Sequence, residues 1–210
     1  MNTIIQEIEN ILRNNYPNGY ANAFVCEGFE KTVSLEEFKD KLGLPLPDLF
    51  CEYYQWLQSV EFPKEDVSNL VGLSNFDEEY ISSLSELLDR IEDWQDIQKK
   101  QPQREWKNGF VEIASWDSCY VKVIDTLGEV ANSGSILYWD FKGGGGYAVI
   151  HENFEMYLKT ILERLKQGIY FPPSYADDEG VDDFSYGETR DKINNLVKEL
   201  NKDAIKFIDW

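Results

Sequence analysis

Two short β-rich runs decide the fold of this chain: Phe110-Val111-Glu112-Ile113-Ala114 and Tyr120-Val121-Lys122-Val123-Ile124. Successive side chains of a strand point to opposite faces of its sheet, so the near-alternation in these runs predicts two strands. The stretch Ser115-Trp116-Asp117-Ser118 separates them, and Asp125 to Gly128 makes the next turn. The runs therefore predict the start of an antiparallel meander.

Two more strands continue this meander. They are predicted at Ile136-Leu137-Tyr138-Trp139 and Tyr147-Ala148-Val149-Ile150, with Gly143 to Gly146 between them. A phosphate-binding glycine loop opens a helix, whose N-terminus holds the anion, whereas a strand follows here. The glycine run therefore predicts a hairpin turn.

Apolar residues at helical spacing predict helices in the sequence before and after the meander. The segments are Ile4 to Leu12, a helix from the capping box Ser34-Leu35-Glu36-Glu37 to near Gly43, one that begins at Pro47, Phe76 to Ile97, Glu152 to Lys166, and Arg190 to Asn201. We expect the apolar end of the chain, Ala204 to Trp210, to pack back on the domain.

Length and composition favour one domain with an extension. The chain has 210 residues, of which 42% are hydrophobic, with six Trp, twelve Tyr and twelve Phe. We expect a domain over residues 1–170, and an acidic loop plus a C-terminal helix over 171–210 that pack on it. No apolar run approaches the roughly 20 residues of a membrane span, and Met1 to Leu12 lacks the pattern of a signal peptide. The expected location is the cytoplasm.

Negative charge dominates the composition. Against 39 Asp and Glu stand 20 Lys and Arg, which gives a net charge of −19. This charge repels nucleic acid and anionic membranes and accelerates encounter with a basic protein. An acidic surface that only keeps the protein soluble is the alternative.

Two acidic segments and one strand end supply the candidate partner-binding residues. Glu79, Glu86, Asp89, Asp93 and Asp96 fall at helical spacing, with only Arg90 near enough to offset them. The second segment holds Asp177, Asp178, Glu179, Asp182 and Asp183 in a predicted loop without Lys or Arg, and Trp139 is offered as an exposed aromatic anchor beside Asp140. An ordinary solvated face is the alternative for the helical ladder.

The sequence predicts no catalytic residue, metal site or cofactor. The single histidine, His151, lies at a predicted helix start without a motif around it. Cys26, Cys51 and Cys119 are far apart and form no Cys-x-x-Cys pair. Pairs among 39 carboxylates arise by chance, so they carry almost no information about hydrolysis.

A series of segments between about residues 30 and 168 follows the order of a known family. The series comprises Leu44-Pro45-Leu46-Pro47-Asp48-Leu49 with Tyr53, Tyr54 and Trp56; Trp106 with Phe110 to Ala114; Val123 to Val130; Ile136 to Asp140; and Phe154, Tyr157 and Leu158. In order and spacing it resembles the SUKH superfamily, which includes the yeast cell-wall assembly regulator and many bacterial immunity proteins. The acidic helix before Trp106 and the tail beyond Phe171 lie outside the motif.

The resemblance implies an α+β fold with a curved, mainly antiparallel sheet of about four to six strands flanked by helices. It also implies action by binding without catalysis, as a cytoplasmic immunity protein that neutralises a basic toxin domain, often a nuclease. The expected partner is the C-terminal toxin domain of a secreted polymorphic toxin, with neither nucleic acid nor a membrane as partner. Two alternatives are a regulatory interaction module of the same family and a carboxylate or metal-dependent hydrolase.

Overall fold

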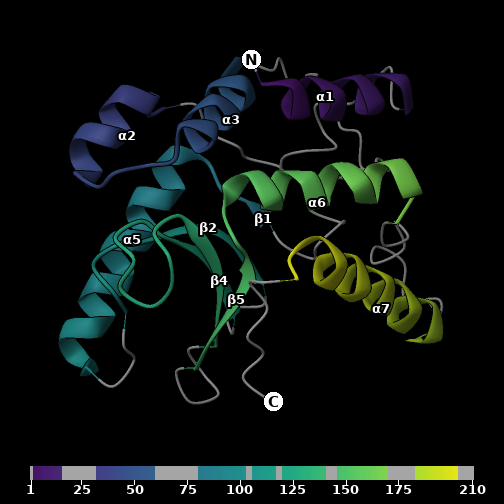
Figure 1. The fold of residues 1–210 in the computed structure, drawn as a ribbon. Coiled ribbons are helices and arrows are strands. Elements are labelled where there is room, and N and C mark those ends of the chain that lie inside the picture. The colour runs from purple at the N-terminus through teal and green to yellow at the C-terminus, as the bar shows by residue number, and fades with distance from the viewer. Residues whose placement is uncertain are drawn as a thin grey trace.

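Helices surround a single antiparallel sheet in this protein (Figure 1). A computed structural model describes residues 2–15, 32–59, 80–102, 106–116, 120–140, 146–169 and 183–202. The α+β class predicted from the sequence is confirmed.

The sheet has five strands that follow one another in chain order. They are β1 (Tyr80–Ile81), β2 (Phe110–Trp116), β3 (Tyr120–Asp125), β4 (Ser135–Asp140) and β5 (Gly146–His151). Every neighbouring pair is antiparallel, and the register is irregular between Glu112 and Ala114 and between Ile136 and Leu137. The predicted meander is confirmed, and β1 is an additional strand at its edge.

Six helices lie within the described ranges. They are α1 (Thr3–Asn15), α2 (Leu35–Leu42), α3 (Asp48–Ser59), α5 (Leu84–Lys100), α6 (Phe154–Gln167) and α7 (Asp183–Leu200). Helix α2 begins where the sequence predicted, since Ser34 Oγ accepts from the backbone N–H of Glu37. It ends at Gly43, whose φ of 63° is a left-handed conformation that glycine adopts without strain.

The sheet is covered by helices from two directions. Helix α6 contacts β4 and β5 and carries α1 and α3 on its outer side, whereas α5 lies along β2 (Figure 1). Aromatic rings connect α3 to α6, because Phe50 and Tyr53 both contact Phe154 at ring-centroid distances of 5.5 and 5.7 Å. One hydrophobic core runs from α1 through α6 and the sheet to α5.

The start of the acidic helix differs from the prediction. The apolar spacing predicted a helix from Phe76, but Tyr80–Ile81 form β1, which pairs with β2 at Ser115 and Ala114, and α5 begins at Leu84. The strand ends at Ile81, and Ser83 caps the helix in a capping box with Glu86, so local capping overrides the apolar period. Phe76 lies outside the described residues.

Helix α7 is longer than the predicted segment from Arg190 to Asn201. It begins at Asp183, which the sequence had placed in the acidic loop. Gly187 and the aromatic residues near it are poor helix formers, and propensity is a weak guide that tertiary contacts override. Helix α7 contacts α6, where Leu196 and Asn201 are buried. The predicted packing of Ala204 to Trp210 falls outside the described residues.

Candidate protein-binding face

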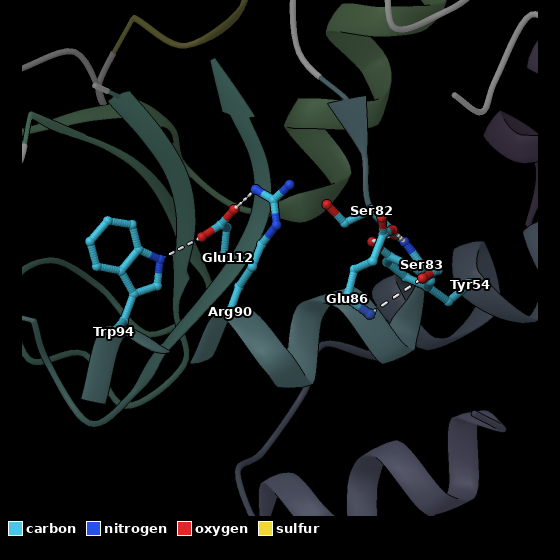
Figure 2. A network of polar contacts seen from close by, with 7 residues as sticks. All are labelled: Tyr54, Ser82, Ser83, Glu86, Arg90, Trp94 and Glu112. Carbon is cyan, nitrogen blue, oxygen red and sulfur yellow. Dashed lines mark hydrogen bonds and ion pairs between the residues drawn. The ribbon is translucent and has the colours of Figure 1, made fainter. Parts of the chain in front are cut away.

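Helix α5 is held firmly at its N-terminus. Ser83 Oγ accepts from the backbone N–H of Glu86 at 3.3 Å, and the Glu86 carboxylate accepts from the backbone N–H of Ser83 at 2.6 Å (Figure 2). The Tyr54 hydroxyl of α3 donates to the Ser82 carbonyl at 3.2 Å, and burial raises its pKa well above the ordinary value, so it remains a donor. Glu86 therefore caps the helix and is half-buried, which removes it from the predicted exposed ladder.

The middle of α5 is anchored to the sheet through one buried carboxylate. Glu112 of β2 is 1% exposed, and its two oxygens accept from the Arg90 guanidinium at 2.5 Å and from the Trp94 indole N–H at 2.6 Å (Figure 2). Arg90 and Trp94 stand four residues apart, so both side chains lie on the same face of the helix. The Arg90 side chain thus forms an ion pair with Glu112 of the sheet, a contact that the sequence did not predict.

A second face of α5 carries an acidic stripe, which we define as Asp89, Glu92, Asp93 and Asp96. All four residues are exposed. At 3.6 residues per turn they fall within about 100° of the helix circumference, and the centre of this arc lies about 130° from the centre of the Arg90 and Trp94 face. Because the helix is fixed by its cap and by Glu112, the stripe is a preformed row of carboxylates.

Two lysines, Lys41 and Lys99, interact with the charges of this stripe. The pKa of Lys41 in α2 is raised, chiefly by the hydrogen bond and charge of Glu37 and further by the charges of Glu92 and Asp89. Lys99 lies 2.8 Å from Asp96, and its hydrogen bond lowers the pKa of that carboxyl. The negative field therefore extends from α5 to α2.

Sequence reasoning identified three of the four members of the stripe. Glu92 was missed, although it stands three residues after Asp89 and four before Asp96, which is the spacing that defined the ladder. Glu79 lies outside the described residues. Within the described residues, the ladder lacks the half-buried Glu86 and is denser in its middle than predicted.

The prediction of Trp139 as an exposed anchor is wrong. Trp139 is 0% exposed and packs against Trp94, Trp106 and Tyr147 at ring-centroid distances of 5.0, 5.4 and 6.4 Å. Strand β4 is paired on both edges and covered on both faces, so the alternation that would leave one side chain in water is lost. Asp140 at the end of the same strand is also buried, at 6% exposure. Neither residue is available to a partner.

Most of the predicted acidic loop lies outside the described residues. Asp177, Asp178, Glu179 and Asp182 lie outside the described residues, and Asp183 is the first residue of α7. These residues therefore remain predictions.

The single histidine is buried in the protein. His151 is buried, 3.5 Å from Thr160 Oγ1, and its ring contacts Tyr157. Burial and the charge of Lys122 lower its pKa to about 3, against an opposing hydrogen bond with Asn201, so the ring is neutral at neutral pH. Within the described ranges, no three His, Cys, Asp or Glu side chains gather in an arrangement able to hold a metal ion.

Comparison with known families identifies the family of the chain. The sequence profile of the SMI1 / KNR4 family (SUKH-1) matches residues 31–160, more than half of the chain. The chain belongs to this family. The SUKH-1 match runs through α5, which sequence reasoning had placed outside the family motif, and ends within α6. A search of curated proteins finds no significant match. None of the described helices is long and apolar enough to cross a membrane.

Proposed function

We propose that this SUKH-1 protein is a cytoplasmic immunity protein, which binds a cognate basic toxin domain and blocks its activity without catalysing a reaction. Membership of the family fits an immunity or interaction module. The observation that carries the proposal is the acidic stripe on α5, because four exposed carboxylates stand in a row on a helix that cannot easily reorient.

Charge complementarity favours a partner that itself binds nucleic acid. Nucleases hold phosphates with Lys and Arg, and this positive groove attracts a protein of net charge −19. An inhibitor that places a row of carboxylates in such a groove takes the position of the phosphate backbone. Steering by charge also brings the inhibitor to the toxin quickly, which an immunity protein needs.

The proposal predicts that a neighbouring gene encodes a secreted protein with a basic C-terminal domain, and this toxin domain is the partner used in the test. Co-expression of the wild-type chain is expected to restore growth of cells that produce that domain, and the purified proteins are expected to form a complex that weakens as salt rises. Failure to bind this domain at low salt, together with failure to protect growth, contradicts the proposal.

A pair of variants tests the location of the interface. Asp89→Asn with Asp93→Asn removes two charges from the stripe, and the matched control Glu188→Gln with Asp191→Asn removes two exposed charges from α7. We expect the first pair to slow association about tenfold at low salt and the control to have a small effect. A larger effect of the α7 pair would move the interface to the side of the acidic tail.

A further inference from the structure

The loop that joins β3 to β4, residues 126–134, presents apolar side chains to solvent. Leu127 is 48% exposed and Val130 is 38% exposed, and these are the exposed large hydrophobic residues of the described ranges. Single exposed apolar residues are common on protein surfaces. Two exposed apolar residues on one short loop require an explanation, since Leu127 and Val130 are only three residues apart.

A buried carboxylate shapes this loop from below. Asp125 is 0% exposed, and its side-chain oxygens accept from the backbone N–H groups of Glu129, Val130 and Ala131 at 2.9, 2.8 and 2.9 Å. Its backbone carbonyl accepts from Gly134 at 2.8 Å. Asp125 thus holds both the middle of the loop, at residues 129–131, and its end at Gly134, just before β4.

Gly109, just before β2, fixes the other side of the loop. Its carbonyl accepts from the backbone N–H and the hydroxyl of Thr126, both at 2.8 Å, and its own N–H donates to Glu129 at 2.6 Å. A Cβ at Gly109 would lie 2.7 Å from the Leu127 Cβ, so the base of the leucine rests directly on the glycine. The loop is therefore rigid before any partner arrives, which lowers the entropy cost of binding.

The loop is close in the chain to the C-terminal part of α5, the helix that carries the acidic stripe. The backbone N–H of Trp106 donates to the Gln98 side chain in the last turns of α5 at 2.8 Å, and only residues 106–109 separate this contact from the loop. Three extended residues span about 10 Å. A standard interface buries about 800 Å² on each partner, a patch about 30 Å across, so a single partner can cover both features.

We propose that Leu127 and Val130 form the apolar anchor of the same interface, which inserts into an apolar depression of a basic protein while the acidic stripe meets its positive rim. This inference rests on the proposed function. Charge complementarity selects the partner, because an apolar anchor on a chain with net charge −19 and an acidic stripe fits a positively charged surface. Rigid apolar centres with charged rims are how tight protein interfaces are built.

The test measures binding of the neighbouring gene's toxin domain to three purified proteins: wild type, Leu127→Ser with Val130→Ser, and the control Asn132→Ser on the same loop. The double variant is expected to bind at least about tenfold more weakly through faster dissociation, with an unchanged salt dependence. The control is expected to match wild type. Equal urea midpoints show that the variants are folded.

Each other outcome has a separate meaning. Wild-type affinity in the double variant overturns the anchor and leaves the proposed function standing. Absence of binding by the wild type overturns the proposed function, and the anchor with it. If sedimentation shows a wild-type dimer that the double variant abolishes, the loop binds a second copy of this chain, which also overturns the inference.

Discussion

Replacing Glu112 by alanine removes the carboxylate of β2 that accepts hydrogen bonds from Arg90 and Trp94 of α5. The Trp94 indole N–H is then left half-buried without its 2.6 Å partner, which costs about 1 to 3 kcal/mol. The Arg90 side chain is 35% exposed and reaches water, so loss of its ion pair adds only about 1 kcal/mol. Together these losses amount to about 2 to 4 kcal/mol, which lowers Tm by about 4 to 16 °C in a chain of this length.

Urea unfolding at pH 7.5 measures this loss, with equal m-values required for the comparison. Glu112→Gln keeps the shape and an oxygen acceptor, so we expect it to fall between the wild type and alanine. Asp96→Ala is the matched control, because the pair of Asp96 with Lys99 is exposed and its loss leaves the midpoint unchanged. If Glu112→Ala unfolds at the same urea concentration as the control, the network of Figure 2 does not anchor α5.

Three further predictions concern the cap, the loop and the core. Ser83→Ala is expected to destabilise the protein by about 1 kcal/mol in urea unfolding, since it removes the acceptor for the Glu86 N–H; a change below a few tenths would contradict the capping role. Asp125→Ala is expected to cost about 2 to 4 kcal/mol and to raise amide exchange at Glu129, Val130 and Ala131, whereas unchanged exchange would show that the loop holds itself. Because the pKa of His151 is lowered, the unfolded chain binds a proton near pH 6.5 and the folded chain only near pH 3. The free energy of unfolding therefore falls as the pH drops through this window, by about 2 kcal/mol between pH 7.5 and 5. His151→Asn should lack this part of the loss, and an equal pH dependence in both proteins would contradict it.

Local patterns predicted the elements of the fold because each segment carries its own start and stop. Ser34 with Glu37 begins α2 and Gly43 ends it, as the sequence indicated. The start of α5 was missed because apolar spacing continues upstream of Ser83, and nothing in that spacing shows that Tyr80 pairs with Ser115 of a distant strand. Strand pairing is a tertiary property, which a period of apolar residues does not encode.

The sequence predicted only the part of the candidate site that lies on helix α5. Asp89, Asp93 and Asp96 lie on the exposed side of α5 because helical geometry fixes their common face. Trp139 was misplaced because its exposure depends on what covers β4, and Trp94, Trp106 and Tyr147 come from three other segments. The inward turn of Arg90 likewise depends on Glu112, 22 residues away.

The central claim is that the exposed face of α5 meets a basic protein through charge. It is tested most directly by stopped-flow association of the chain with the neighbouring gene's toxin domain over a series of salt concentrations. We predict a rate that falls steeply with salt for the wild type and the Glu188→Gln with Asp191→Asn control, and a slower rate with a shallower slope for Asp89→Asn with Asp93→Asn. Identical rates and slopes for all three proteins would contradict the claim.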